Sequence, residues 1–363
     1  MAFSAHSTDE EVKEYFDSDD KITNNVKELA KLIKESKHCV LYTGAGISTS
    51  SGISDFRGPN GVWTLRAKGQ KPVSRPNFKM PTLAHMAVKR LVDEELVKYV
   101  VSQNTDGLHV RSGIPDNKIA ELHGNTNKEF CKKCKKMFYR DFHTREAHDV
   151  HDHTTSRKCT CGEYLNDTII NFSESLPEEE LKNGIDNSEK SDLAIVLGTS
   201  LRVSPACTLP SMKKKEGSLV ICNLQKTPYD KTAQMVIHTQ TDKLMGLLMQ
   251  ELGLPIPDFV FEFGFQVDLD ETQKLIGIRN CSADLRSLLL VFKVVDSANK
   301  RFDMKSVGAR RFEAKLSSCN GKSGVGLEFE FNLLSPFRGE VRLLTPGYVR
   351  LAINTNKNTL EHK

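Results

Sequence analysis

The sequence lacks the features that would place a chain in a membrane, outside the cell or on a nucleic acid by composition alone. No run approaches the roughly 18 consecutive apolar residues of a membrane helix, so we expect no membrane partner. The acidic segment 1–20 has neither the zones of a secretory signal nor the composition of a transit peptide. A net charge of +4 over 363 residues is too small to indicate nucleic-acid binding, which stays open. We therefore expect a chain of the cytosol or the nucleus.

Disulfides are not expected either, because nine cysteines without an export signal indicate free thiols or metal ligands. Cys131 and Cys134 form C-x-x-C, and Cys159 and Cys161 form C-x-C after 24 intervening residues. Four thiolates suit a tetrahedral zinc ion, and the polar interval has little core of its own, so we predict a structural zinc in a module at about 127–166. A redox C-x-x-C is the competing interpretation, and the tight C-x-C leaves the fourth ligand open. The alternative ligands are the histidines of the interval, His143, His148, His151 and His153.

What the sequence does contain is a repeated pairing of a short apolar run with a polar or glycine motif. The runs are 38–42, 98–102, 193–197 and 218–222. Such runs are typical of buried parallel strands, and helical patterns occur at 81–96 and 241–253. The second helix is expected to have Thr241 or Asp242 as N-cap and to end at Gly253. We predict an α/β fold with a doubly wound, Rossmann-like parallel sheet, whose ligand binds beyond the carboxyl ends of the strands.

The stretch from Thr43 to Trp63 follows the first run and contains five glycines. A glycine-rich turn between a strand and a helix lets backbone N–H groups approach a pyrophosphate at the helix N-terminus. The usual dinucleotide fingerprint fails, because after Gly44 and Gly46 its third glycine would fall at Thr49, and no acid follows about twenty residues later. A tight turn without a ligand is the alternative. The same stretch adds an acid, a ring and a guanidinium that suit a loop covering a ligand, namely Asp55, Phe56 and Arg57.

Six motifs in a fixed order resemble those of the sirtuins, the NAD-dependent protein deacylases. They are GAGIS at 44–48, DFR at 55–57, QNTD at 103–106, HG at 123–124, GTS at 198–200 and NLQ at 223–225. The resemblance covers about Val26 to Pro257, and its details are similar to the class IV branch that contains the sixth and seventh mammalian sirtuins, with the seventh closer. It implies a Rossmann-like catalytic domain with an inserted zinc ribbon, whose second cysteine pair is commonly C-x-x-C in the family.

The residue types also fit the cleavage of NAD. Loss of nicotinamide leaves an oxocarbenium-like ribose, which a site must stabilise while it binds the carboxamide. Asn104 and Asp106 follow a buried strand and suit these tasks, with an Asx-type turn as the alternative. A histidine such as His123 titrates at about 6.5 when unperturbed and suits a general base, with a hydrogen-bonded structural role as the alternative.

The family resemblance implies site residues one by one. It assigns catalysis to His123 and Asn104. It implies that NAD, the co-substrate, is bound by Gly44, Ala45, Gly46, Ser48, Asp55, Phe56, Arg57, Gln103, Asn104, Asp106, Gly198, Thr199, Ser200, Asn223 and Leu224.

The expected function is NAD-dependent protein lysine deacylation, or deacetylation, with release of nicotinamide and acyl-ADP-ribose. The branch resemblance implies nuclear acyl-lysine substrates, histones or other chromatin-associated proteins. Mono-ADP-ribosyl transfer and an NAD-binding scaffold with weak catalysis are the alternatives.

In the family the segment Phe172–Leu176 pairs with the substrate peptide. Ser173 stands where many members have glycine, and Ser54 and Thr105 are further departures, so the acyl preference is not predicted.

The chain is expected to have three parts. These are an acidic N-terminal segment, 1–25, the catalytic domain, 26–257, and a C-terminal module, 258–363. In the last part, short alternating segments recur at a spacing of about ten residues, which is typical of an all-β sandwich or barrel. We expect this module to bind a partner.

Overall fold

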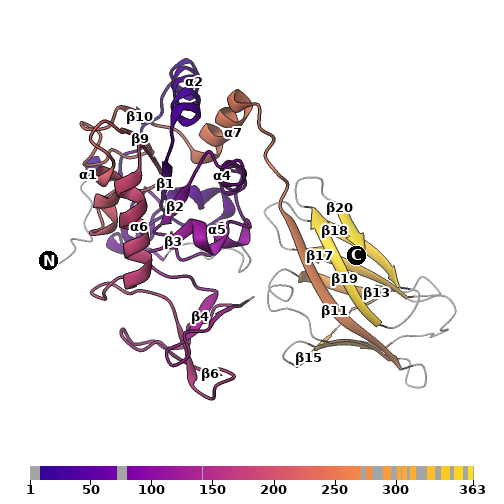
Figure 1. The fold of residues 1–363 in the computed structure, drawn as a ribbon. Coiled ribbons are helices and arrows are strands. Elements are labelled where there is room, and N and C mark those ends of the chain that lie inside the picture. The colour runs from indigo at the N-terminus through magenta and orange to yellow at the C-terminus, as the bar shows by residue number, and fades with distance from the viewer. Residues whose placement is uncertain are drawn as a thin grey trace. The chain divides into compact units, whose positions relative to one another are not determined.

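The computed structural model describes residues 9–71, 80–140 and 142–270, together with the further strands named at the end of this section. Side chains are described within these ranges from residue 11 to residue 260. One compact unit ends at Pro257 and a second contains Asp258–Lys363, and each is described by itself (Figure 1). None of the helices in the described part combines the length and the apolar content that a membrane crossing requires.

A six-stranded sheet forms the centre of the first unit, in the order β10-β9-β8-β1-β2-β3 (Figure 1). Its strands are β1 Cys39–Thr43, β2 Tyr99–Ser102, β3 Ile119–Glu121, β8 Leu193–Leu197, β9 Ser218–Cys222 and β10 Met235–Ile237. Every neighbouring pair is parallel. The four apolar runs are confirmed as strands. The edge strands β3 and β10 were not predicted, because they have only three residues each.

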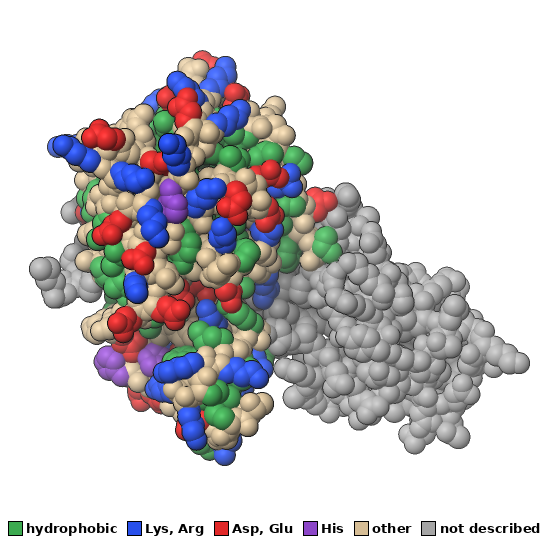
Figure 2. All heavy atoms as spheres, viewed as in Figure 1, with side chains coloured by type: hydrophobic (Ala, Val, Ile, Leu, Met, Phe, Trp, Pro, Cys, Tyr) green, Lys and Arg blue, Asp and Glu red, His purple; other side chains and the backbone are tan. Residues whose placement is uncertain are grey.

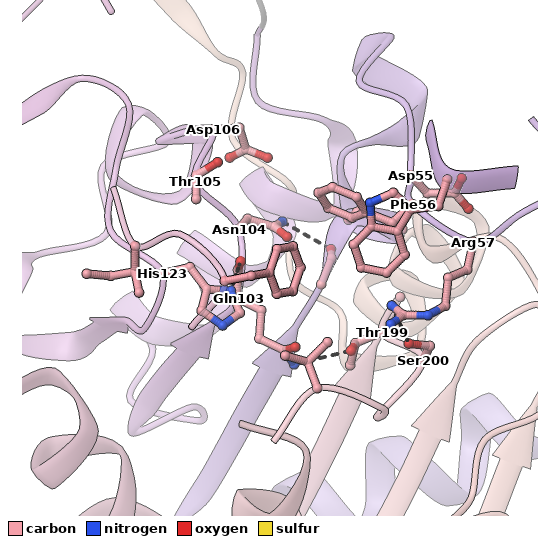
Figure 3. Close-up of a pocket in the computed structure, with 18 of the residues that line it drawn as sticks. Asp55, Phe56, Arg57, Gln103, Asn104, Thr105, Asp106, His123, Thr199 and Ser200 are labelled. Carbon is pink, nitrogen blue, oxygen red and sulfur yellow. Dashed lines mark hydrogen bonds between the residues drawn. The ribbon is translucent and has the colours of Figure 1, made fainter. Parts of the chain in front are cut away.

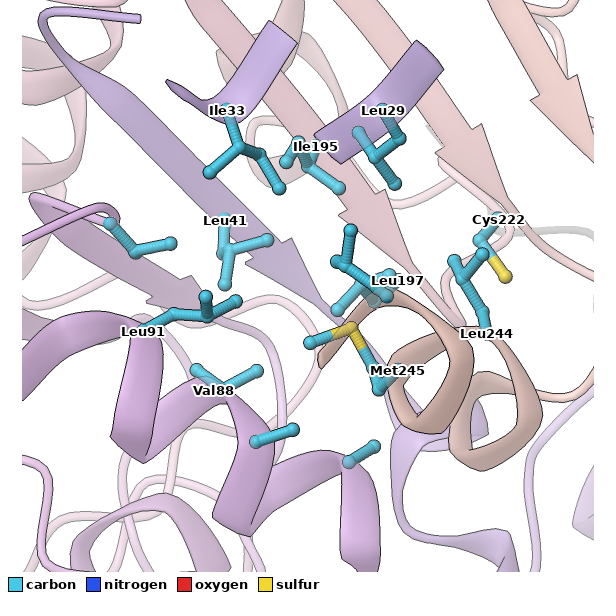
Figure 4. Close-up of a cluster of buried hydrophobic side chains, with 14 of the residues drawn as sticks. Leu29, Ile33, Leu41, Val88, Leu91, Ile195, Leu197, Cys222, Leu244 and Met245 are labelled. Atoms are coloured by element: carbon cyan, nitrogen blue, oxygen red, sulfur yellow. The ribbon is translucent and has the colours of Figure 1, made fainter. Parts of the chain in front are cut away.

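Helices cover both faces of this sheet, which confirms the doubly wound prediction. The longer helices are α2 Asp19–Glu35, α4 Leu83–Asp93, α6 Glu178–Lys190 and α7 Thr241–Leu252. The shorter ones are α1 Asp9–Val12, α3 Val62–Ala67 and α5 Leu108–Arg111, with 3-10 turns η1 Ala45–Ile47, η2 Thr49–Ser51, η3 Asp116–Lys118 and η4 Ala206–Met212. Successive strand residues face opposite ways, so Leu41 joins the core with α2, α4 and α7 (Figure 4), and Tyr42 joins the core with α6 and η4.

Helix α2 crosses the predicted boundary between residues 25 and 26. Ser18 is its N-cap and accepts a hydrogen bond from the backbone N–H of Lys21. Ile22 and Val26, on either side of the predicted boundary, are both buried in the same core. The end of the acidic segment is therefore part of the first unit, because its apolar face packs there.

The ends of α7 confirm one prediction and correct another. Gly253 ends the helix with a φ of 70°, as expected of a glycine C-cap. The N-cap is Gln240 rather than Thr241 or Asp242. Asp242 instead accepts a hydrogen bond from the backbone N–H of Ala84 at 2.9 Å, which ties α7 to α4.

A small antiparallel sheet, ordered β5-β4-β7-β6, is inserted between β3 and α6. Its strands are β4 Lys128–Cys131, β5 Met137–Tyr139, β6 Thr154–Lys158 and β7 Tyr164–Asp167. We call residues 127–167 the zinc module. Over the face seen in Figure 2, Lys and Arg side chains of the first unit are interspersed with Asp and Glu, which agrees with the low net charge.

The described elements of the second unit are strands in two antiparallel sheets, ordered β15-β16-β12-β11-β19-β20 and β14-β13-β17-β18. They are β11 Val260–Asp270, β12 Leu275–Arg279, β13 Leu289–Val295, β14 Arg301–Asp303, β15 Lys305–Gly308, β16 Arg311–Lys315, β17 Val325–Phe331, β18 Phe337–Leu343, β19 Gly347–Asn354 and β20 Thr359–His362. The residues between these strands are outside the described part, so an all-β domain at 258–363 stays a prediction.

Candidate functional site

A pocket of about 660 Å³ lies where β1, β2, β3, β8 and β9 end (Figure 3). The carboxyl ends of parallel strands meet at one edge of the sheet, so the motifs that follow them converge. The pocket is lined by 14 of the predicted site residues, which are Gly44, Ala45, Gly46, Asp55, Phe56, Arg57, Gln103, Asn104, Asp106, His123, Gly198, Thr199, Ser200 and Asn223.

Two predicted residues, Ser48 and Leu224, do not line the pocket. Ser48 lies behind the wall, where its hydroxyl donates to Asp106 Oδ2 at 2.7 Å and accepts from Asn104 Nδ2 at 3.3 Å. The backbone oxygen of Leu224 accepts a hydrogen bond from Tyr15 at 2.9 Å. Both residues therefore support the wall, and their direct contact with a ligand stays a prediction.

The glycine motif that follows β1 packs against the loop that follows β8. The backbone N–H of Gly46 donates to the oxygen of Gly198 at 2.8 Å, and a Cβ on Gly46 would lie 2.6 Å from the Gly198 Cα. Where the usual dinucleotide fingerprint continues into a helix, this chain has the short turns η1 and η2. The missing third glycine is explained, because no long helix has to pack closely against β1 at that point.

We expect Gly46→Ala to destabilise the first unit by about 1–3 kcal/mol, since a Cβ would press backbone against backbone. Urea unfolding followed by circular dichroism measures this. Gly246→Ala is the matched control, because Gly246 lies within α7 with only ordinary contacts, and it should stabilise the helix by about 1 kcal/mol. Equal stability of Gly46→Ala and the wild type would contradict the close approach.

His123 is placed as a base. Its Nδ1 lies 2.8 Å from the backbone oxygen of Gln103, and because a carbonyl oxygen only accepts, Nδ1 carries the proton. Nε2 is then the unprotonated nitrogen, and the ring lines the pocket (Figure 3). Burial lowers the pKa of His123, and the hydrogen bond to Gln103 offsets this only in part. The imidazole is therefore neutral at pH 7 and able to accept a proton.

Asn104 is fixed by its own side-chain amide. Nδ2 donates to the backbone oxygen of Gly44 at 3.0 Å and to Ser48, which uses both amide protons and leaves Oδ1 for a donor on a ligand. Asp106 accepts from Ser48 and from the backbone N–H of Leu108 at 2.9 Å. The last bond is the Asx-type turn that the sequence left open, and Asp106 lines the pocket as well.

Two side-chain hydrogen bonds join opposite walls of the pocket (Figure 3). Gln103 Nε2 donates to Thr199 Oγ1 at 3.2 Å, and Arg57 Nη1 donates to Ser200 Oγ at 3.4 Å. The Arg57 guanidinium also lies 4.4 Å from the centre of the Trp63 ring. The Arg57–Ser200 bond holds the DFR loop, and the Gln103–Thr199 bond holds the loop that follows β2, against the loop that follows β8.

Aromatic rings gather at the pocket. Trp63 lies 5.1 Å from the Phe56 ring and 5.5 Å from the Phe172 ring, and all three line the pocket. Phe56 and Phe172 are about half exposed, at 47% and 52%, so an apolar group of a ligand could bury them. Trp63 is the only tryptophan of the sequence, but nothing in its sequence position identified it as a pocket residue.

Asn223 and Gln225, in the loop that follows β9, also line the pocket. Gln225 belongs to the NLQ motif but was not among the predicted site residues. Glu14 accepts a hydrogen bond from Gln225 Nε2 at 3.3 Å, and Asp17 accepts from the backbone N–H of His238 at 2.8 Å. The bonds of Tyr15 and Glu14 attach the N-terminal segment to the loop that follows β9, and the Asp17 bond attaches it to the residue that follows β10. No sequence pattern signalled this contact.

The segment 170–176 lines another side of the pocket. Its Ser173 has a φ of 75°, the left-handed conformation that glycine adopts without strain. A glycine is therefore favoured at this position over residues with a side chain. The strain also makes Ser173 a point at which the segment can be relaxed by mutation.

We expect Ser173→Gly to stabilise the protein by up to about 1 kcal/mol, because the relief of left-handed strain exceeds the entropy lost by a more flexible unfolded chain. Thermal and urea unfolding measure the change. Ser175→Gly is the matched control, because Ser175 is exposed and its φ is not positive. Glycine at this position should lower the stability of the protein. A lower stability of Ser173→Gly would show that strain at this residue is negligible.

The four predicted metal-ligand cysteines form one cluster. Their sulfur atoms all lie within 4.8 Å of one another, and the pairs Cys131–Cys161 and Cys134–Cys159 are each separated by 3.5 Å. A tetrahedral zinc with Zn–S bonds of about 2.3 Å needs sulfur separations of about 3.8 Å, so the set fits zinc. The C-x-C pair therefore supplies two ligand atoms. Within the described residues, no histidine belongs to this cluster.

Comparison with known proteins agrees with this geometry. A sequence profile described as the Sir2 family matches residues 70–205. The NAD-dependent protein deacetylase SRT1 of Oryza sativa subsp. indica is 45% identical over 273 residues, 73% of this chain and 56% of that protein. The NAD-dependent protein deacetylase Sirt6 of Drosophila melanogaster is 42% identical over 68% of this chain and 81% of its own length. The NAD-dependent protein deacetylase sirtuin-7 of Mus musculus is 42% identical over 68% of this chain and 64% of its own.

A solved Sir2 structure with a deacetylated p53 peptide and 3′-O-acetyl ADP-ribose is 33% identical, with a TM-score of 0.50 over 63% of this chain and 99% of that one. The chain thus spans just over half the length of SRT1 but most of Sirt6. Similarity to both Sirt6 and sirtuin-7 confirms the predicted branch resemblance. The ordered motifs converge on one pocket, and the inserted sheet carries a four-cysteine cluster. With these relatives, the chain belongs to the Sir2 family, the sirtuins.

Proposed function

We propose that this chain is an NAD-dependent protein lysine deacylase. The observation that carries the proposal is His123, whose Nε2 is left unprotonated in the same pocket as Asn104. A neutral base and a fixed amide oxygen are the groups needed to deprotonate a ribose hydroxyl and to hold a carboxamide. The proteins named as NAD-dependent protein deacetylases among its relatives support the same activity.

In the proposed reaction, the bond between nicotinamide and ribose C1′ breaks and its electron pair goes to nicotinamide. The acyl oxygen of the modified lysine forms a bond to C1′. His123 Nε2 takes the proton of a ribose hydroxyl, whose oxygen attacks the acyl carbon. The proton then passes to the lysine nitrogen as the bond between this nitrogen and the acyl carbon breaks. One water adds to the acyl carbon, and the bond between that carbon and the C1′ oxygen breaks, so the products are nicotinamide, acyl-ADP-ribose and lysine.

The proposed binding of NAD follows the pocket from one end to the other. Asn104 and Asp106 hold the nicotinamide and its ribose near His123, and the glycine motif and the GTS loop hold the phosphates. Asn223 and Gln225 bound the adenosine end. The convergence of these residues on one pocket supports this arrangement.

The proposed substrates are acyl-lysine proteins of the nucleus, histones or other chromatin-associated proteins. Sequence similarity to Sirt6 and sirtuin-7 supports this choice of branch.

We also propose that 258–363 binds a partner. A chain shortened to end at Asp258 that retains every cellular partner would reject the partner-binding proposal.

The first experiment incubates the full chain with NAD and acetyl-, succinyl- and myristoyl-lysine histone peptides and follows the products by mass spectrometry. Formation of acyl-ADP-ribose with the matching acyl group supports the proposal and identifies the preferred acyl chain. NAD consumption with ADP-ribose attached to protein would favour mono-ADP-ribosyl transfer instead. NAD binding without any product would favour the scaffold.

A further inference from the structure

Glu174 connects two parts of the first unit that are separate in sequence. It belongs to the pocket segment 170–176, but its side chain is only 8% exposed and its carboxylate is occupied by hydrogen bonds. Oε1 lies 3.0 Å from His153 Nε2 and 3.1 Å from His151 Nδ1, and it accepts the backbone N–H of His151 at 2.9 Å. Both histidines belong to the zinc module. One carboxylate oxygen thus holds the zinc module to the pocket wall.

The second oxygen of Glu174 closes a turn in its own segment. Oε2 accepts from the backbone N–H and from Nδ2 of Asn171, the latter at 3.0 Å. The backbone N–H of Glu174 donates to the Asn171 oxygen at 3.2 Å, and Ser173 lies inside this turn. Because Ser173 is left-handed, the turn needs outside support to keep its shape.

His153 is itself held from the opposite side. Its Nδ1 lies 3.2 Å from Asp167 Oδ1 at the end of β7, and Asp167 is fully buried. Arg145 lies 3.2 Å from Asp167 Oδ2 and pairs with the same carboxylate. The ring of His153 is therefore fixed between a carboxylate of the zinc module and the carboxylate of Glu174.

The charge of Glu174 strengthens this connection. Burial raises the pKa of Glu174, but hydrogen bonds from Asn171 and His153 outweigh burial and lower the pKa to about 2. A folded-state pKa below the usual value means that the ionised carboxylate stabilises the fold above about pH 4.5, and that this is lost as the pH falls towards 2. The carboxylate of Glu174 is therefore ionised at every pH at which the protein would work.

We propose that Glu174 is a positioning residue that fixes the peptide-binding segment Phe172–Leu176 to the zinc module through His151 and His153. The inference rests on the proposed deacylase function, in which this segment adds a substrate peptide as a neighbouring strand. A segment already ordered before the peptide arrives spares the complex the entropy of ordering it. The carboxylate acts on peptide binding, whereas the NAD contacts lie on the loops after β1, β2, β8 and β9.

The test compares Glu174→Ala, Glu174→Gln and His153→Ala in the full chain with an acetyl-lysine histone peptide. We expect the KM for peptide to rise about tenfold in Glu174→Ala, while the KM for NAD changes by less than about twofold. The KM for peptide of Glu174→Gln should lie between the values of Glu174→Ala and the wild type, because an amide oxygen still accepts from Asn171 but carries no charge. Glu178→Gln is the matched control, since Glu178 is exposed at the start of α6. Its KM values for peptide and for NAD should equal those of the wild type.

Hydrogen–deuterium exchange of the amides in 171–176 tests the same idea without catalysis. We expect faster exchange there in Glu174→Ala and His153→Ala at unchanged zinc content. If Glu174→Ala does not fold, His153→Ala decides the question, because Asp167 keeps Arg145 as a partner. Unchanged exchange, or equal rises in KM for NAD and peptide, would overturn the inference. A wild type that makes no acyl-ADP-ribose would reject the proposed function, while the exchange rates would still decide whether Glu174 orders the segment.

Discussion

Replacing His123 by alanine should lower the rate of acyl-ADP-ribose formation by about 10²–10⁴-fold, the usual contribution of a general base. The variant loses the only imidazole that lines the described pocket, together with its hydrogen bond to the Gln103 oxygen. It keeps the bond of Asn104 to Gly44 and the side-chain bond from Gln103 to Thr199, so the pocket walls should remain. NAD binding should therefore persist. Mass spectrometry measures the product, and calorimetry measures the binding of NAD.

The control for this variant is His148→Ala, an exposed histidine of the zinc module, which should retain wild-type activity. The pH dependence of the rate is a second test of the role of His123. Burial lowers the pKa of His123, so the base stays neutral below the pH at which an ordinary imidazole becomes protonated. The acidic limb of the rate profile should therefore fall below about pH 6.5. Full activity of His123→Ala would remove His123 from the chemistry.

Removing the zinc should have the largest effect on the fold. Structural zinc contributes an apparent free energy of about 10–16 kcal/mol in small zinc peptides. Among the described residues, the hydrophobic core of the zinc module consists of Cys131, Cys159 and Leu165, with Phe138 packed beside it. Chelation or Cys131→Ala should therefore unfold β4 to β7. Zinc content, circular dichroism and acyl-ADP-ribose formation measure the result.

Activity should be lost with the zinc module, because the chain that leaves it supports the base. The backbone N–H of Ile170 donates to the His123 oxygen at 3.1 Å, and Thr168 Oγ1 accepts from the backbone N–H of Asn125 at 3.0 Å. Cys207→Ala, outside the cluster, should retain both zinc and activity. Normal activity after complete removal of zinc would show that the metal is not needed to hold the site.

Much of this site could be predicted because its residues sit at strand ends. A buried strand in a parallel sheet must be apolar on both faces, so β1, β2, β8 and β9 are visible as runs, and whatever follows them meets at one edge. The cysteine cluster was visible for a different reason, since metal ligands need particular side chains at close spacing. Both kinds of signal are local in sequence.

The features that the sequence did not reveal depend on contacts between distant segments. The backbone N–H of Tyr15 donates to Leu224 after β9, and that of Asp17 donates to His238 after β10. No residue type is diagnostic of such backbone hydrogen bonds. Glu174 pairs with His151 and His153 across more than twenty residues, and the histidines alone looked like spare zinc ligands. The edge strands β3 and β10 are too short to show a pattern, and their pairing with neighbours decides their structure.

The pairing of β1 with β8 at the centre of the sheet sets the order in which the protein can form on the ribosome. Cys39 lies opposite Leu193 in this pair, so the strand that precedes the glycine motif has one of its two neighbours only after the chain has been made through Leu197. Contacts between such distant residues close late and slow folding. We expect a nascent chain that ends before β8 to lack the pocket altogether and to expose one edge of β1 to other chains.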